Sequence, residues 1–319
     1  GNNLTTEDSE QATEPMASKW GAGIVVPMVT PLTPAGDLDE PAVRRLVDHL
    51  LAGGVAGIFV LGTTGEDASL PAPMRARLVA ITVEQVGRRA AIYAGISHNC
   101  LSESVAAARH YRELGADVLV ARLPTYFALS GEEQQAYFQA LLAQIPGPLM
   151  LYNISSTTHM TLPLDVVEAL SQHPKVVGLK DSDADLPRLE ELVQRLGGRP
   201  GFSLLCGVTA WSARALALGA DGLVPSTANL VPALCQQLYE RSCCGALSGA
   251  EACQRELDAL SRLLRTGQTI GQSIASLKAA MGALDLCGPT MLPPLTTAPP
   301  DRQEALRAAF RRWQAGRDA

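Results

Sequence analysis

Short β-favouring runs alternate with helix-like segments from residue 22 almost to the end of the chain. Eight such runs are present, at residues 22–29, 57–62, 90–96, 117–123, 148–153, 175–180, 202–207 and 221–226. The runs are continuously apolar, which is typical of strands in a parallel sheet that is covered on both faces. The segments between them carry apolar residues at helical spacing, as at Leu46, Val47 and Leu50. Eight strand-helix units predict an α/β fold, a (β/α)8 or TIM barrel.

The competing architecture is a doubly wound open sheet. Such a sheet usually carries a phosphate-binding loop, and neither GxGxxG nor GxxxxGK[ST] occurs in this sequence. After the eighth run, helical periodicity continues through residues 249–266 and 301–315, which is more than one closing barrel helix needs. We therefore expect a catalytic barrel over residues 19–245 and a C-terminal helical extension over residues 246–319.

Composition limits the partners and the cell compartment. The net charge of -6, with no run of Lys or Arg, argues against binding to nucleic acid or to an anionic membrane. No apolar run approaches the ~20 residues of a membrane helix. The seven cysteines are scattered and form no CxxC motif, so we expect a reducing cytoplasm. Residues 1–18 are polar and acidic, which predicts a disordered arm or an expression remnant rather than a signal peptide.

One lysine stands at the end of an apolar run. The chain holds four lysines against 22 arginines, and Lys180 closes the run VVGLK. The active site of a parallel barrel forms at the C-terminal ends of its strands. Burial penalises the charged form of an amine, so a lysine in a barrel mouth keeps more of the neutral, nucleophilic form that attacks a ketone. The alternative is an unreactive strand-end lysine paired with Asp181 or Asp183.

Two other strand ends carry residues that could take part in chemistry. The stretch GTTGE at residues 62–66 offers successive backbone N–H groups in one tight turn, which can bind a carboxylate, although a plain turn would also explain it. Tyr152 ends the run PLMLY and could relay protons, although a lone tyrosine at this position is more often structural. Together with Lys180, they combine a carboxylate holder, a proton relay and an amine nucleophile.

This combination resembles the dihydrodipicolinate synthase and N-acetylneuraminate lyase family of class I, lysine-dependent aldolases and lyases. The resemblance covers roughly residues 22–316 and runs in order through VVPMVTP, GTTGE, LPTYF, YNI, VVGLKDS, GADGLVPSTAN and MLPPL. It implies a homotetramer built as a dimer of dimers. It also implies a Schiff base with pyruvate or another 2-oxo acid. The lysine imine is itself the electron sink, and the five histidines form no metal-binding spacing, so we expect no cofactor and no metal.

The resemblance also implies roles for individual residues. Lys180 would form the imine with the 2-oxo acid, and Thr63 and Thr64 would hold the carboxylate. Tyr152 would shuttle protons, linked through the Thr63 hydroxyl to Tyr126 from a neighbouring subunit. The substrate would be bordered by Gly207 and by the carbonyl of Val224.

Two departures from the family pattern bear on the substrate. In synthases that make dihydrodipicolinate, the segment YN(V/I)P continues to an arginine that binds the second substrate's carboxylate. Here it reads YNISSTTHM, with Ser155 for the proline and Thr157 for the arginine. Threonine cannot make a bidentate carboxylate contact, which makes synthase activity the less favoured alternative. Sialic-acid lyases use acidic side chains after the strand-seven glycine, where this chain has Val208, Thr209 and Ala210.

The remaining polar side chains near the mouth suit a short 2-oxo acid with one or two hydroxyls, or a substrate with an apolar end: Ser155, Ser156, Thr157, Thr158, His159, Ser182, Thr209 and Ser226. The leading hypothesis is a lyase that cleaves a 2-keto-3-deoxy or 4-hydroxy-2-oxo acid to pyruvate and an aldehyde. A dehydratase or deaminase acting through the same imine is its nearest rival. A non-catalytic relative that binds a small molecule is the alternative from a different class.

Overall fold

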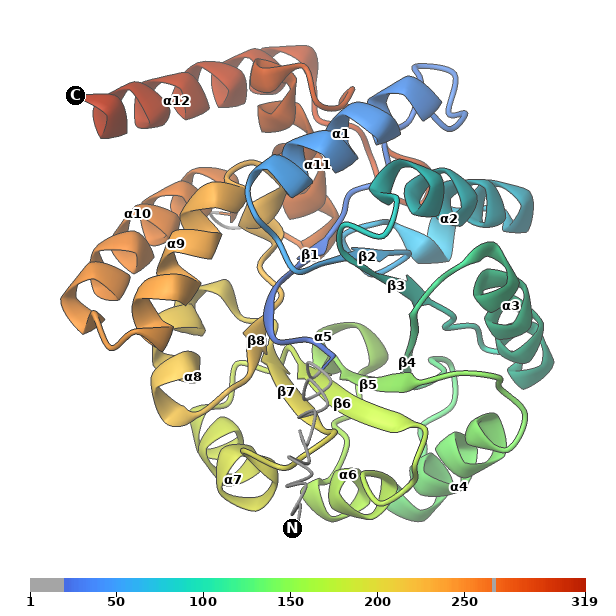
Figure 1. The fold of residues 1–319 in the computed structure, drawn as a ribbon. Coiled ribbons are helices and arrows are strands. Elements are labelled where there is room, and N and C mark those ends of the chain that lie inside the picture. The colour runs from blue at the N-terminus through green and yellow to red at the C-terminus, as the bar shows by residue number, and fades with distance from the viewer. Residues whose placement is uncertain (1–19, 266–267) are drawn as a thin grey trace, which may run out of the picture.

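The computed structural model describes residues 20–265 and 268–319. Eight parallel strands form a closed barrel in chain order, with β8 paired to β1 (Figure 1). This confirms the predicted (β/α)8 fold. The strands are β1 Gly23–Pro27, β2 Gly57–Val60, β3 Ala91–Gly95, β4 Val118–Arg122, β5 Leu149–Asn153, β6 Val176–Asp181, β7 Ser203–Cys206 and β8 Gly222–Leu223. Each coincides with one of the eight predicted runs.

Helices surround the strands as an outer ring (Figure 1). They are α1 Glu40–Ala52, α2 Ala72–Val86, α3 Leu101–Leu114, α4 Gly131–Leu142, α5 Ser155–Thr158, α6 Leu164–Leu170, α7 Leu186–Leu196, α8 Ser212–Leu218 and α9 Pro232–Cys243. Short 3-10 turns follow three of the strands, namely η1 Asp67–Ser69, η2 Thr209–Trp211 and η3 Ser226–Asn229.

Local sequence signals set the helix ends. At the start of α1, the Asp39 side chain accepts a hydrogen bond from the amide of Ala42 at 3.1 Å. Helices α2 and α3 end at Gly87 and Gly115, which adopt positive φ angles of 54° and 110°. Glycine adopts this left-handed conformation without a steric penalty from Cβ, so the chain can leave the helix and enter the next strand.

Successive side chains on each strand point to opposite faces of the sheet. One set packs against the helices and forms the larger apolar core. The other set forms a smaller cluster with Val25, Phe59, Met150, Tyr152 and Leu205 among its members, which we assign to the barrel interior. Because Tyr152 belongs to this set, the strand-end residues in register with it face the barrel mouth.

The C-terminal extension consists of α10 Leu247–Arg265, α11 Ile270–Met281, the 3-10 turn η4 Gly282–Leu284 and α12 Pro300–Asp318. Helix α10 packs against α9, and α11 packs against α12. The predicted boundary between residues 245 and 246 falls between α9 and α10. The prediction for residues 1–18 lies outside the described residues.

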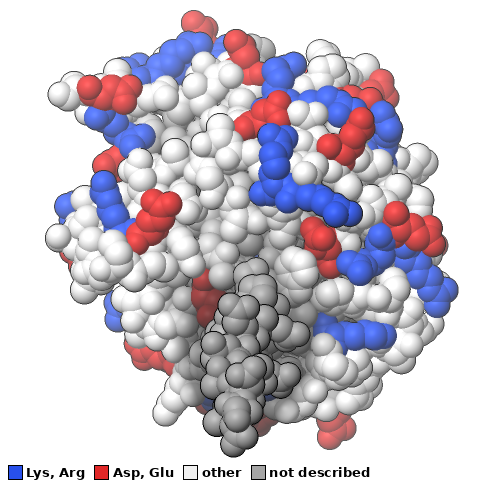
Figure 2. All heavy atoms as spheres, in the orientation of Figure 1, with Lys and Arg blue, Asp and Glu red and all other residues white. Residues whose placement is uncertain are grey.

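On the face drawn in Figure 2, Lys and Arg side chains are intermixed with Asp and Glu side chains. Within residues 20–265 and 268–319, no helix is both long enough and apolar enough to cross a membrane.

Candidate active site

Lys180 lies inside the barrel mouth. It is the penultimate residue of β6, in register with Tyr152 on β5 and Leu205 on β7. Its side chain is 6% exposed. The amine Nζ lies 4.2 Å from the centre of the Tyr152 ring and 5.1 Å from the centre of the Phe59 ring. The amine therefore lies against two aromatic rings.

The two carboxylates next to Lys180 in the sequence have other partners. Arg188 Nε donates to Asp181 at 2.9 Å, because Asp181 points to the opposite face of the sheet from Lys180. The amide and the hydroxyl of Ser155 donate to Asp183 Oδ1, at 2.9 and 2.7 Å. No carboxylate of the described residues forms an ion pair with Lys180. The alternative of a lysine paired with Asp181 or Asp183 is therefore wrong.

Hydrogen bonds to Asp183 also affect its ionisation. Partial burial acts to raise the pKa of Asp183, but donors led by the Ser155 hydroxyl and amide outweigh it and hold that pKa below the usual value. Asp183 therefore stays charged and bound within its own loop. The thiol of Cys206, which is paired in register with Asp181, behaves differently, because burial raises the pKa of Cys206 to about 11 and keeps the thiol protonated.

The GTTGE turn presents backbone amides that could bind an anion. The amides of Gly65, Glu66 and Asp67 donate to carbonyls within the turn. Within the part of the chain that the structure describes, the amides of Thr63 and Thr64 have no hydrogen-bond acceptor. Glu66 adopts a left-handed φ of 58°, which tightens the turn. Two adjacent unpaired N–H groups form an anion-binding nest of the kind that holds carboxylates.

Tyr152 connects this turn to the amine. Its hydroxyl is hydrogen-bonded to the Thr63 hydroxyl, with 3.1 Å between the two oxygens. The ring is 3% exposed and packs edge-on against Phe59, with 6.3 Å between ring centres. The phenol is thus fixed between the threonine turn and Lys180, where a proton relay requires it.

A cavity of about 380 Å³ joins these groups. Eight of the eleven predicted site residues line it, namely Thr63, Thr64, Tyr152, Lys180, Ser182, Gly207, Val224 and Ser226. Gly207 leaves the space that the lysine needs, since a Cβ there would lie 2.2 Å from Ser182 Oγ and 3.2 Å from Lys180 Cε. Any larger residue would displace one of these side chains.

Two residues predicted to bind substrate do not line the cavity, and their predicted roles stay predictions. The Thr157 hydroxyl donates to the Ile154 carbonyl at 3.3 Å, because the short helix α5 turns it back onto its own backbone. Thr209 is 3% exposed and its carbonyl accepts hydrogen bonds from Ser212 and Gln254, so it secures η2 to α8 and α10. Neither belongs to the cavity lining.

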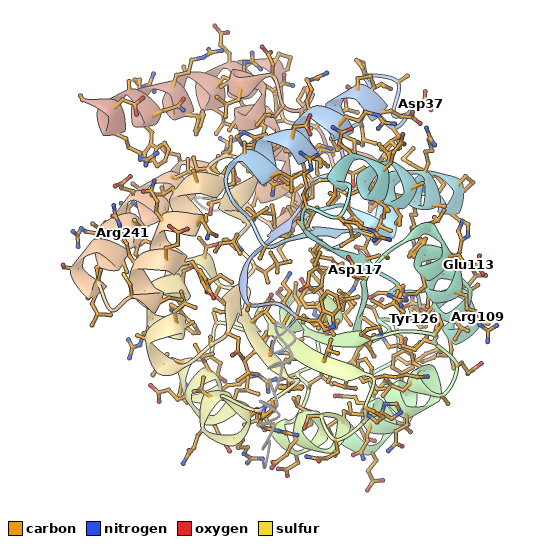
Figure 3. The ribbon with its side chains drawn as sticks, in the orientation of Figure 1. Asp37, Arg109, Glu113, Asp117, Tyr126 and Arg241 are labelled. Atoms are coloured by element: carbon orange, nitrogen blue, oxygen red, sulfur yellow. The ribbon has the colours of Figure 1, made fainter. Side chains whose placement is uncertain are left out.

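Tyr126 belongs to the loop between β4 and α4, and in the view of Figure 3 it lies between β4 and α3. Its side chain is 88% exposed, and its ring packs edge-on against Phe127 with 5.1 Å between ring centres. It does not line the cavity of its own chain. Its predicted role in the site of a neighbouring subunit stays a prediction.

The sequence analysis missed what the C-terminal extension contributes. Four apolar side chains from α10 and α11 line the cavity, namely Leu264, Ile270, Ile274 and Leu277. Lys278 on α11 forms a fully buried ion pair with Glu66 of the GTTGE turn, with 2.7 Å between Nζ and Oε2. The sequence feature that could have indicated this buried ion pair is Lys278, one of only four lysines, inside the apolar stretch SIASLKAAM. Among the described residues, no group of three or more His, Cys, Asp or Glu could hold a metal ion.

Comparison with known proteins agrees with this geometry. The model of the dihydrodipicolinate synthetase family matches residues 21–312. The chain belongs to this family. Members of the dihydrodipicolinate synthetase family are class I aldolases and lyases, so the resemblance seen in the sequence motifs is confirmed.

Curated relatives cover nearly the whole chain. A 4-hydroxy-tetrahydrodipicolinate synthase of Albidiferax ferrireducens is 30% identical over 288 residues, 90% of this chain and 95% of the relative. One from Thiobacillus denitrificans is 32% identical over 289 residues, 91% of this chain and 96% of the relative.

Solved structures of the family superpose well. Dihydrodipicolinate synthase from Bacteroides thetaiotaomicron is 31% identical, with a TM-score of 0.88, and covers 92% of this chain and 99% of its own. YagE, a family member from E. coli K12 solved in complex with pyruvate, is 26% identical, with a TM-score of 0.85, and covers 92% of this chain and 98% of its own.

Proposed function

We propose that this chain is a lyase that forms a Schiff base between Lys180 and a 2-oxo acid. Its substrate is a short 4-hydroxy-2-oxo or 2-keto-3-deoxy acid, which it cleaves to pyruvate and an aldehyde. The observation that carries this proposal is the position of the Lys180 amine. It is buried without a carboxylate partner among the described residues, against a phenol that is hydrogen-bonded to Thr63.

Binding and imine formation follow from the groups around the amine. The unpaired amides of Thr63 and Thr64 take the substrate carboxylate and orient the adjacent C2 carbonyl toward Lys180. The neutral amine attacks C2 to give a carbinolamine, which loses water and becomes a protonated imine. Tyr152 moves the protons that these two steps require.

Cleavage then uses the imine as an electron sink. The bond between C3 and C4 breaks, and its electron pair moves toward the imine nitrogen to give an enamine. The C4 hydroxyl becomes the aldehyde, and its proton passes through the hydroxyls of Tyr152 and Thr63. A proton is returned to C3, and water hydrolyses the imine, releasing pyruvate and the free amine. The water lost in imine formation is thereby replaced.

Borohydride trapping tests the first half of this proposal. Incubation with pyruvate and sodium borohydride should add the mass of a reduced pyruvoyl adduct to Lys180. Absence of an adduct, under conditions that label another Schiff-base member of the family, would overturn the proposal in favour of a non-catalytic binding protein.

Product analysis tests the second half of the proposal, the cleavage to pyruvate and an aldehyde. Loss of water or ammonia with an intact carbon skeleton would replace the lyase by a dehydratase or deaminase.

Synthase activity is the second candidate, because the curated relatives above are named 4-hydroxy-tetrahydrodipicolinate synthase. A second substrate with its own carboxylate would need a cation to bind it. Lys180 is the one charged side chain among the described residues that line the cavity, and it is needed for the imine. Condensation of pyruvate with an aldehyde that carries an amino acid group should therefore be slow. Fast condensation would favour the synthase.

We further propose that a second copy of this chain covers Tyr126, as part of a homotetramer. Tyr126 and Phe127 are 88% and 74% exposed, which is unusual for neighbouring aromatic side chains. Tyr126 also has a positive φ of 54°, a strained conformation for a residue of this size. Light scattering after size-exclusion chromatography should report a tetramer for the wild type. A monomer with full activity would contradict the proposal.

A further inference from the structure

The cavity around Lys180 extends beyond the catalytic groups into the C-terminal extension. Leu264 from α10 and Ile270, Ile274 and Leu277 from α11 line this distal part. Three of them are buried, whereas Ile270 is 38% exposed. The volume of about 380 Å³ lies within the ~300–1,000 Å³ of small-molecule sites, so there is room beyond a pyruvoyl unit.

Three hydroxyls around α5 are occupied within the protein, whereas Thr64, Ser182 and Ser226 line the cavity close to Lys180. The Ser155 hydroxyl donates to Asp183 at 2.7 Å, and the hydroxyls of Thr157 and Thr158 donate to the Ile154 carbonyl. These side chains would otherwise be the natural partners of a polyhydroxylated substrate. Because they are already hydrogen-bonded inside their own loop, they are poorly placed to bind the substrate.

The part of the cavity that α10 and α11 line offers few hydrogen-bonding groups. Gln268 and Ser273 are its polar members from the extension, and the Gln268 amide is hydrogen-bonded to Ser276 with 3.0 Å between the two atoms. Lys180 is the one charged side chain among the described residues of the lining. A charged group placed against α10 and α11 would lose its water and meet no charged partner on these helices among the described lining residues, whereas an apolar group would gain from burial.

We propose that the aldehyde part of the substrate is an uncharged group with an apolar chain or ring, and that α10 and α11 set this preference. The inference rests on the Schiff-base lyase proposed above and names its substrate class. The pyruvoyl half of the substrate is held by Lys180 and the threonine turn. The C4 substituent then points along the cavity toward the leucine and isoleucine side chains.

The test is the reverse, aldol direction, with pyruvate and two aldehydes. We expect the wild type to use benzaldehyde with a kcat/KM at least about 10-fold above that for glyceraldehyde, the scale on which apolar pockets discriminate. A preference for glyceraldehyde, or turnover of neither aldehyde, would overturn this inference while borohydride trapping of pyruvate upheld the Schiff base. Failure of trapping would overturn both.

Two matched variants locate the preference. Ile270→Ser removes an apolar group from the wall and should lower the ratio of kcat/KM for benzaldehyde over glyceraldehyde by about 10-fold. Leu263→Ser is the control, because Leu263 is also 38% exposed and lies outside the lining. The ratio is insensitive to a general loss of folded enzyme. An unchanged ratio in Ile270→Ser, or an equal change in Leu263→Ser, would overturn the inference.

Discussion

Two buried lysines of this chain have opposite surroundings. At the barrel mouth, Lys180 is 6% exposed, and its amine contacts aromatic rings in a cavity without an ion-pair partner among the described residues. On α11, Lys278 is fully buried, and its amine donates to Glu66 at 2.7 Å and to the Thr290 carbonyl at 2.6 Å. The other Glu66 oxygen accepts from the Leu292 amide at 3.1 Å.

The comparison separates burial from reactivity. Both amines are removed from water, but the charge of Lys278 is compensated by a carboxylate and its donors are occupied. Lys180 has no such compensation within residues 20–265 and 268–319, and it borders the cavity. The carboxylates beside Lys180 in the chain are bound by Arg188 and Ser155. Lys278, which is buried with a carboxylate partner, stabilises the fold. Lys180, which is buried without one among the described residues, has an amine that is available to react.

The strongest test of this contrast is Lys180→Ala. It should abolish the borohydride adduct and turnover, because the nucleophile is removed. Peptide mapping of the labelled wild type should place the adduct on Lys180 alone. Labelling of Lys278, or an adduct that persists in Lys180→Ala, would break the comparison. Lys180→Arg serves as the control for charge, since it keeps a cation but forms no imine.

Lys278→Met should act on stability. It leaves Glu66 buried without a cation, which should lower the free energy of unfolding by about 3–5 kcal/mol in a urea titration. The double variant Lys278→Met with Glu66→Gln removes the orphaned charge and should recover much of this loss. Arg195→Met, at a solvent-exposed cluster of ion pairs, is the control and should change stability far less. Equal effects of Lys278→Met and Arg195→Met would contradict the assignment.

Tyr152→Phe should slow turnover by about 10²-fold while leaving pyruvate trapping detectable, because the proton relay is lost but the amine remains. The matched control is Tyr93→Phe. Tyr93 is also buried among the strands, and burial raises the pKa of Tyr93 to about 12, so it stays a protonated phenol. Steady-state rates distinguish the two. Normal turnover in Tyr152→Phe would remove the relay from the mechanism.

The smallest effect is expected for Ser155→Ala. The pKa of Asp183 is held below its usual value, so this carboxylate stabilises the fold above a pH of about 4 and loses that contribution as the pH falls through its folded pKa. Removing the Ser155 hydroxyl should cost about 1 kcal/mol at pH 7, after allowance for solvent screening. The difference from wild type should shrink below pH ~4. If the difference in the free energy of unfolding between Ser155→Ala and wild type stayed constant with pH, the hydrogen bond to ionised Asp183 would not be its cause.

The barrel was predictable because each strand is a short, continuously apolar run. Residues 57–60 of β2 and 118–122 of β4 read as buried strands without reference to the rest of the chain. The positions of the proposed catalytic side chains were predictable for a related reason. Strand ends meet at one rim of a parallel barrel, so the positions of Lys180, Tyr152 and the GTTGE turn followed from strand order.

What could not be predicted depends on contacts distant in sequence. Glu66 and Lys278 are 212 residues apart, and no local pattern joins them. The side chains of α11 fit an ordinary amphipathic helix, and only packing decides that Ile270 and Ile274 reach the cavity. Thr157 was placed by analogy with an arginine of the family, but a short side chain satisfies its own backbone where a long one would extend into the cavity.

The contact between Glu66 and Lys278 limits how this family can be recombined. A hybrid that takes its barrel from one member and its last three helices from another would have to preserve both halves of that contact. Otherwise the GTTGE turn would lose its ion pair with α11, even if every proposed catalytic side chain were retained. Protein engineers should therefore treat the helical tail as part of the reaction centre and choose crossover points that keep it with its own second strand.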